Sequence, residues 1–388
     1  MPENDQQTES IGSNESNLLP GAPETGAAAV ADKELDIKTL LSELVEASGS
    51  DLHLKVGQPP IFRVDGKLAR TAFPTIDQER LESLIDQMID EPKKAKLMES
   101  RELDMAYSVP GLARFRVNIF WQSNKLGMVC RVIPINIKTI EELGLPAVTK
   151  KFADLNRGLV LVTGPTGSGK STSLAAIIDH INSTRKAHII TIEDPVEFLH
   201  KDKVAAINQR ELGADTHSFA AALKHVMRQS PDVILVGELR DLETISLALT
   251  AAETGHLVFA TLHTTDAAQT IDRICDVFPP EEQPRVRMQL ANSLRGIVSQ
   301  TLVPAINGGR LAAFEILISH SGVRNLIREG KTHQIYNLIQ TGSNYGMQLL
   351  DQSLKLLLQK NVVTFDDVIA KASNPSDFES MAPRAVRY

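Results

Sequence analysis

The stretch GLVLVTGPTGSGKSTSLAAII, residues 158–178, decides the fold class of this chain. It begins as a short apolar strand and ends as a helix. Between them lies GPTGSGKS (164–171), which matches the pattern G-x-x-x-x-G-K-[ST]. By chance such a match arises in roughly one chain in a hundred of this length, and far less often between a strand and a helix. The stretch therefore predicts a phosphate-binding loop in an α/β domain.

The chemistry of this loop follows from its spacing. Glycines let backbone N–H groups turn inward around phosphate oxygens, and the helix N-terminus adds its dipole. Lys170 is predicted to reach the β- and γ-phosphates of ATP, and Ser171 or Thr172 to offer a hydroxyl to Mg²⁺. The predicted nucleotide-binding residues are Gly164, Pro165, Thr166, Gly167, Ser168, Gly169, Lys170, Ser171 and Thr172.

Outward from the loop, short apolar strands alternate with longer helical segments. Strands are predicted at 187–192, 232–237 and 256–262, with one or two more near 296–303 and 311–318. This alternation is typical of a parallel sheet with helices on both faces. We therefore expect catalytic side chains beyond the carboxyl ends of the strands.

Ionisable residues flank three of these strands. Glu193 begins EDPVE (193–197), Glu238 follows the next strand, and His256 and His263 flank the last one. Each alone could be a helix cap, a solvated acid or an ordinary histidine. Beside a phosphate-binding loop, these side chains are together typical of a site that uses acids, bases and metal ligands.

Hydrolysis of ATP suggests a role for each of these side chains. Glu238, after an apolar strand, is predicted to be the base for the attacking water. Glu193 is predicted to hold Mg²⁺ or its waters together with Ser171, and Glu197 to support it. His263 is expected to contact the γ-phosphate, whereas His256, at the other end of its strand, is better placed for coupling.

The chain is predicted to contain two folded domains because 388 residues exceed what one core usually serves. The first 34 residues lack aromatic residues and are predicted to be disordered. In full, we expect an acidic tail (1–34), a small α+β domain (35–133), a linker (134–145), the ATPase domain (146–320), a helical region (321–378) and a flexible C-terminus (379–388).

The small domain carries arginines that could stabilise charge on the γ-phosphate. In ARFRVNIF (113–120), Arg114 and Arg116 share one strand face, and Arg131 lies on the following strand. The residues alone favour a solvated sheet face.

Charge and cysteine content exclude several classes of protein. Residues 1–32 hold six acidic residues and no Lys or Arg, so the remainder has 41 basic and 42 acidic residues. That near-neutral balance disfavours binding to nucleic acid. Two cysteines without a CxxC pair exclude a disulfide framework and a tetracysteine zinc site. With no signal peptide or apolar span, we expect a cytoplasmic protein that is at most peripheral to a membrane.

From about residue 35 to 378 the chain resembles the PilT family of type IV pilus retraction ATPases. The resemblance rests on GPTGSGKST as Walker A, TIEDPVEF as the Asp box, VILVGELRD as Walker B and TGHLVFATLHT as the His box. It implies a PAS-like N-terminal domain before a RecA-like ATPase domain. It also implies that Arg116 and Arg131, with Arg114 a weaker match, are lent to the nucleotide site.

The same resemblance implies a homohexamer that hydrolyses ATP to retract a pilus and so drives twitching motility. Its implied partners are a pilus platform protein at the inner membrane and a sibling retraction ATPase. The stretch NKLGMVCRVIP (124–134) is similar to the accessory motor PilU as much as to PilT.

GVRNLIRE (322–329) resembles the family's C-terminal motif, AIRNLIRE, with Gly322 in place of the leading Ala. Taken alone, the octet fits a solvated amphipathic helix. The resemblance favours a functional helix, in which Arg324 and Arg328 face a partner or neighbouring domain while Leu326 and Ile327 anchor it.

Three other functions compete with retraction. A pilus-extension or type II secretion ATPase is disfavoured by the missing tetracysteine module and by GVRNLIRE. A DNA-handling P-loop ATPase is disfavoured by the near-neutral charge. A ring component that binds ATP without turnover is disfavoured because Lys170, Ser171, Glu193 and Glu238 are all in place.

Overall fold

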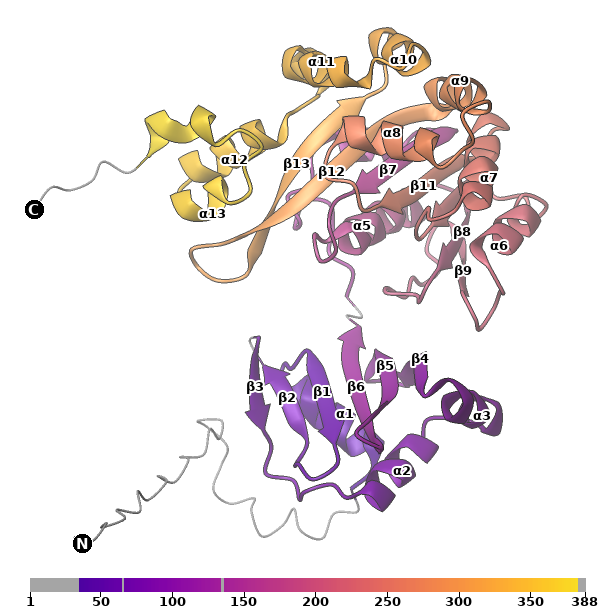
Figure 1. Cartoon of the computed structure of the whole chain (residues 1–388), viewed down its shortest axis with the longest axis vertical. Helices are drawn as coiled ribbons and strands as arrows, with labels where there is room; N and C mark the ends of the chain where they lie inside the picture. The colour runs from indigo at the N-terminus through magenta and orange to yellow at the C-terminus, as the bar shows by residue number, and fades with distance from the viewer. Residues whose placement is uncertain (1–34, 65, 134–135, 383–388) are drawn as a thin grey trace, which may run out of the picture. The chain divides into compact units, whose positions relative to one another are not determined.

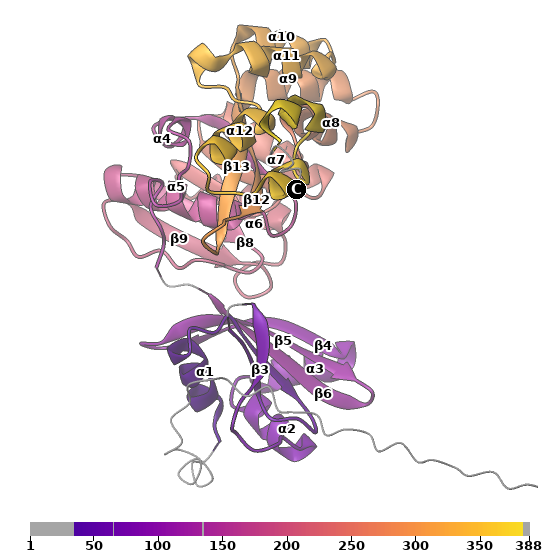
Figure 2. The same ribbon diagram turned by 90° about the vertical axis from the view of Figure 1, so that its left-hand side faces the viewer.

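A computed structural model describes residues 35–64, 66–133 and 136–382 (Figures 1 and 2). The chain divides into two compact units, the first ending at residue 135 and the second beginning at residue 136. The predicted acidic tail, two residues of the predicted linker and residues 383–388 lie outside the described residues. None of the described helices is long and apolar enough to cross a membrane.

The first unit is an antiparallel sheet with helices, in the strand order β3-β2-β1-β6-β5-β4. Ile37, Leu40, Leu41 and Leu44 recur at helical spacing and are buried in its core. Its elements are α1 (Ile37–Glu46), β1 (Asp51–Lys55), β2 (Ile61–Val64), β3 (Lys67–Arg70), α2 (Gln78–Asp86), α3 (Glu91–Ser100), β4 (Glu102–Val109), β5 (Ala113–Gln122) and β6 (Lys125–Ile133).

Strand β5 has the two-faced pattern that the sequence predicts. Phe115, Val117 and Ile119 are fully buried, whereas Arg114 is half-buried and Arg116 is exposed. Because side chains alternate along a strand, both arginines lie on the face away from this core.

The second unit is a seven-stranded sheet in the order β13-β12-β7-β11-β10-β8-β9. Its neighbouring strands run parallel except for β13, which pairs antiparallel with β12. The strands are β7 (Gly158–Thr163), β8 (His188–Glu193), β9 (Ala206–Glu211), β10 (Val233–Val236), β11 (Leu257–Leu262), β12 (Leu294–Pro304) and β13 (Arg310–Ile318).

Helices cover both faces of this sheet, as the alternation of elements predicts. One face packs against α4 (Val148–Ala153) and α5 (Lys170–Thr184). The other packs against α6 (Phe219–Val226), α7 (Leu242–Glu253), α8 (Ala267–Asp276) and α9 (Gln283–Ser293), with α10 (Ser321–Arg328) and α11 (Ile335–Thr341) beyond them (Figure 1). The sheet is therefore buried on both sides.

The end of the chain packs on the β12–β13 hairpin. Leu354 of α12 (Leu350–Gln359) and Val368 of α13 (Phe365–Ile369) share a small core with Phe378. Short 3₁₀ turns lie at Thr332–Gln334, Ser343–Tyr345 and Pro375–Met381. Within the predicted linker, Ile140 and Leu145 are buried in the core of the second unit.

Candidate active site

Four adjacent parallel strands end at the same edge of the second sheet. In the order β7-β11-β10-β8, the register pairs Thr163 with Leu262, Ala260 with Val236, and Val236 with Ile192. The phosphate-binding loop, His263, Glu238 and Glu193 therefore follow neighbouring strand ends, as the sequence predicts.

The phosphate-binding loop joins the end of β7 to the start of α5. Gly164, Gly167 and Gly169 have φ values of 140°, 77° and 89°, which side chains rarely adopt. A Cβ on Gly164 would also lie 2.2 Å from the backbone oxygen of Gln300. Glycine is therefore required at 164 by both backbone conformation and space.

Gln300 braces this loop from β12. Its side chain is buried, Nε2 donates to the backbone oxygen of Ser168 at 2.6 Å, and Oε1 accepts from Ser173 Oγ at 2.9 Å. One amide thus fixes both the loop and the first turns of α5.

A chain of polar contacts links Lys170 to Glu238. Lys170 Nζ lies 3.5 Å from Nδ1 of His263, whose Nε2 lies 3.1 Å from Glu238 Oε1. A neutral imidazole protonated at Nε2 satisfies both contacts, because it accepts from the lysine and donates to the carboxylate. Arg240 Nη2 binds Glu238 Oε2 at 2.8 Å. Lys170 also donates to the backbone oxygens of Gly164 (2.8 Å) and Pro165 (3.1 Å).

These contacts set the electrostatics of the site. Burial lowers the pKa of Lys170, although the carboxylates of Glu238 and Glu197 oppose this. Burial alone would raise the pKa of Glu238, but the bond from Arg240 and the nearby His263 lower it overall. Glu238 is therefore held as a carboxylate within reach of the loop lysine.

Glu193, at the end of β8, has a different environment. Thr191 Oγ1 donates to its Oε1 at 2.7 Å, and Gln209 Nε2 donates to the same oxygen at 3.1 Å. Burial nevertheless raises the pKa of Glu193, which these two bonds and a bond from the Glu197 backbone N–H only partly offset. The site thus has one carboxyl group of lowered pKa and one of raised pKa.

A cavity of about 380 Å³ opens beside these groups. Its lining includes Glu238, Arg240 and His263 at the ends of β10 and β11, together with Gln269 and Arg273 of α8.

His256 lies apart from this set. It precedes β11, at the amino end of the strand, and its Nδ1 lies 3.0 Å from the backbone oxygen of Ala251. The ring is therefore bonded at the edge opposite the phosphate-binding loop.

In the first unit, Arg116 and Arg131 lie directly opposite each other on β5 and β6. Asp51 of β1 is buried and binds Arg131 Nε at 2.7 Å and Arg63 Nε at 3.4 Å. Burial alone would raise the pKa of Asp51, but bonds from Ser50 and Arg131 lower it overall. An ionised Asp51 thus orients Arg131 beside Arg116.

Comparison with known proteins identifies the family. The family model described as type II/IV secretion system protein matches residues 27–368. The type IV pilus retraction ATPase PilT of Pseudomonas aeruginosa is 52% identical over 344 residues, which are 89% of this chain and all of that protein. The chain belongs to the PilT family. The type IV pilus ATPase PilU of the same organism is 41% identical over 348 residues, covering 89% of this chain and 91% of PilU.

A crystal structure of the pilus retraction motor PilT with bound ADP has the same fold as this PilT-family chain. The TM-score is 0.84 at 45% identity, over 90% of this chain and all of that one.

The C-terminal motif of this PilT-family chain forms α10. Ile327 is buried and Leu326 is half-buried against the main core, so both anchor the helix. Arg324 Nη2 donates to the backbone oxygen of Ser319 at 3.4 Å, and exposed Arg328 binds Asn325 Oδ1. Arg324 is therefore turned partly toward its own domain, and Arg328 toward solvent.

Three polar residues of the site were missed by the sequence reasoning. Arg240 lies two residues after Glu238, and this position close to the strand end could have identified it as a site residue. Gln300 is the middle residue of the polar run Ser299-Gln300-Thr301, which interrupts the apolar residues of strand β12 and was also visible in the sequence. Gln209 gave no signal, because strand β9 itself was not predicted.

Proposed function

We propose that the chain is an ATP-hydrolysing motor of the PilT type that powers type IV pilus retraction and twitching motility. The observation that carries this proposal is the joined set of Lys170, His263 and Glu238 at one sheet edge. It occurs in a chain that matches PilT over that protein's whole length.

Residues of the second unit bind the nucleotide in this proposal. The backbone N–H groups of 164–169 surround the phosphates, and Lys170 exchanges its bonds to the Gly164 and Pro165 oxygens for phosphate oxygens. A magnesium ion shared with phosphates needs only one or two protein oxygens, and the Ser171 hydroxyl with the Glu193 carboxylate fits that need. The ion, when bound, neutralises charge on the phosphates.

Glu238 is proposed to orient and deprotonate the attacking water, and His263 to register the γ-phosphate. The contact between His263 and both Lys170 and Glu238 supports this assignment. A second assignment, with Glu193 as the base, is favoured by its raised pKa, because a base is most effective with a pKa near the working pH.

Two amide substitutions separate these assignments. With Glu238 as the base, Glu238→Gln should lose about 10²-fold or more in turnover while still binding ATP. Glu193→Gln should then show its loss mainly as a higher Mg²⁺ requirement. The reverse pattern would transfer the base role to Glu193, and two fully active variants would refute both. Lys170→Ala, in contrast, should lose nucleotide binding.

We further propose a ring in which a PAS-like domain (35–133) of one subunit lends Arg116 and Arg131 to the RecA-like domain (146–320) of its neighbour. The remaining proposed segments are the tail 1–34, the linker 134–145, the helical region 321–378 and the C-terminus 379–388. The ring would be a homohexamer in the cytoplasm, peripheral at the inner membrane on a pilus platform protein.

The role in the cell is tested by deleting the gene and imaging pili. Abundant pili without twitching support retraction. Cells without surface pili would indicate a role in pilus assembly. Unaltered pili with normal twitching would refute any role in the pilus system. Partial loss of retraction that depends on a second ATPase would favour the PilU-type role, for which the 41% identity to PilU is the motivating observation.

A further inference from the structure

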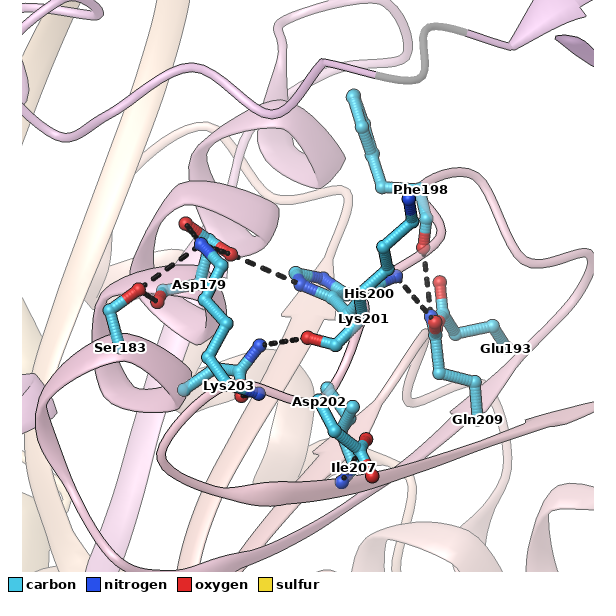
Figure 3. A network of polar contacts seen from close by, with 11 residues as sticks. Asp179, Ser183, Glu193, Phe198, His200, Lys201, Asp202, Lys203, Ile207 and Gln209 are labelled. Carbon is cyan, nitrogen blue, oxygen red and sulfur yellow. Dashed lines mark hydrogen bonds and ion pairs between the residues drawn. The ribbon is translucent and has the colours of Figure 1, made fainter. Parts of the chain in front are cut away.

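Gln209 on β9 is bonded to Glu193 although the two residues are 16 positions apart. In the parallel pairing of β8 with β9, Gln209 stands opposite Thr191, two residues before Glu193. The Gln209 side chain is half-buried, and its Nε2 donates to Glu193 Oε1 at 3.1 Å (Figure 3). The pairing of β8 with β9 therefore places the Gln209 amide next to the Glu193 carboxyl group.

The two ends of this amide have different partners. Nε2 also donates to the backbone oxygen of Phe198 at 2.8 Å, and Oε1 accepts from the backbone N–H of His200 at 2.8 Å. A flipped amide would set oxygen against the Glu193 oxygen and NH₂ against the His200 N–H, so these partners fix its orientation. Neither glutamate nor an apolar residue can make all three bonds.

The segment that Gln209 holds, residues 194–205, is here called the box loop. Its far part is attached to α5, the helix that begins at Lys170. Asn182 Nδ2 donates to the Lys201 oxygen at 2.8 Å. Lys203 Nζ binds Asp179 at 2.7 Å (Figure 3). The box loop is thus fixed at Gln209 and at the helix of the phosphate-binding loop.

The His200 side chain fills the space between these two attachments. The side chain is only 3% exposed, and its Nδ1 lies 3.9 Å from Asp179 Oδ1. Burial lowers the pKa of His200 to about 4. A neutral imidazole at this place packs the box loop against α5 without adding charge.

We propose that Gln209, together with Thr191, is a positioning residue for ATP hydrolysis that holds Glu193 by its Oε1. Both bonds end on that oxygen, so neither side chain engages Oε2. Glu193 keeps one orientation toward the nucleotide, and the box loop keeps its place beside it. This inference rests on the proposed participation of Glu193 in turnover and adds what orients it.

The test compares variants of the full-length protein. Gln209→Met keeps the length of the side chain and removes all three bonds. Gln209→Glu keeps only the acceptor for the His200 N–H. Asn208→Ala is the matched control, because Asn208 is exposed on the same strand and bonds His188. The measurements are kcat and KM for ATP, the Kd of a fluorescent ATP analogue, and the thermal midpoint.

We expect both Gln209 variants to lose about 10- to 100-fold in kcat, because a small displacement of a reacting group has that effect. KM and Kd should stay close to wild type, and Asn208→Ala should be unchanged. Because the Phe198 oxygen loses its partner in both Gln209 variants, the thermal midpoint should fall by about a few degrees while the variants remain folded at the assay temperature. A loss that instead follows KM, or follows unfolding at the assay temperature, would show a purely structural role and overturn the inference.

Thr191→Val, which keeps the side-chain shape, gives a second reading if Gln209→Met does not fold. It should lower kcat at unchanged Kd, and in combination with a folded Gln209 variant the losses should be less than multiplicative. Folded variants with kcat within twofold of wild type, beside an inactive Glu193→Gln, would overturn this inference alone. A fully active Glu193→Gln would instead remove the proposed role of Glu193 and the inference with it.

Discussion

The brace formed by Gln300 allows a prediction whose size can be worked from the structure. Gln300→Met keeps a similar shape and removes both of its bonds, to the Ser168 oxygen and from the Ser173 hydroxyl. The hydroxyl, within α5, can turn to the backbone oxygen four residues earlier, at Gly169. Only the Ser168 oxygen then lacks its partner, at a cost of about 1–3 kcal/mol.

This cost can be expressed in two ways. If the phosphate-binding loop keeps its conformation, the free energy of unfolding falls by the whole amount. If the loop relaxes, stability is regained but nucleotide binding must restore the loop, and each 1.4 kcal/mol then weakens binding by about tenfold. The sum of the stability loss and RT ln of the Kd ratio should therefore come to about 1–3 kcal/mol in either case.

Urea unfolding and titration with a fluorescent ATP analogue measure the two quantities on the same variant. Gln289→Met is the control, because Gln289 bonds Glu253 at an exposed site where little change is expected. A Gln300→Met protein with both stability and affinity within about 0.5 kcal/mol of wild type would refute the brace.

Three further predictions concern separate parts of the chain. Burial raises the pKa of Glu315 from 4.5 to about 7, so the folded state loses stability as the pH rises through that range. Relative to wild type, the free energy of unfolding of Glu315→Gln should therefore increase by up to about 3 kcal/mol across that range. Unfolding measured at pH 4 and at pH 8 tests this. Arg116→Ala should lower ATP turnover without changing the thermal midpoint. Unchanged turnover would mean that Arg116 is a solvent-exposed residue with no part in hydrolysis. Gly322→Ala should raise the melting temperature only slightly. The added Cβ would lie 2.8 Å from the His320 side chain, and this close approach offsets the helix propensity of up to ~1 kcal/mol that alanine contributes. An increase of several degrees would contradict this.

The short apolar runs in the sequence were enough to predict the strands of the second unit, with one exception. The exception is β9, AINQRE (206–211), in which polar residues from 208 onward obscure the strand pattern. It lies at the edge of the sheet, where one side of the strand needs no partner. Edge position, and not poor pairing, explains why its sequence gave so weak a signal.

The rule that functional groups follow the carboxyl ends of parallel strands predicted that Lys170, His263 and Glu238 lie close together. It could not predict their bonds. Whether Glu238 pairs with His263, Arg240 or a metal depends on side-chain conformations within a few ångströms, which no periodicity encodes. The first unit illustrates the same limit, since the sequence placed Arg116 and Arg131 on strands but did not reveal that Asp51 of β1 binds Arg131.

Polar residues within the buried strands show how the site is fixed in place. Strands β7, β10 and β11 are fully buried, and a polar group there is costly unless it is bonded. Thr261 Oγ1 donates to the backbone oxygen of Gly237, next to Glu238, and Thr163 Oγ1 donates to Ser299 Oγ at 2.8 Å, next to Gln300.

Thr191 extends this pattern to β8, because its hydroxyl binds the carboxyl group of Glu193, the last residue of that strand. In each case a polar residue near the carboxyl end of a strand is bonded to a residue of the candidate site or to its neighbour in the chain, and Gln209 does the same from β9. The apolar residues at the amino ends of these strands make no such bonds and contribute packing. Substitutions near the carboxyl ends should therefore lower ATP turnover more than stability, whereas large-to-small changes at the amino ends should do the reverse.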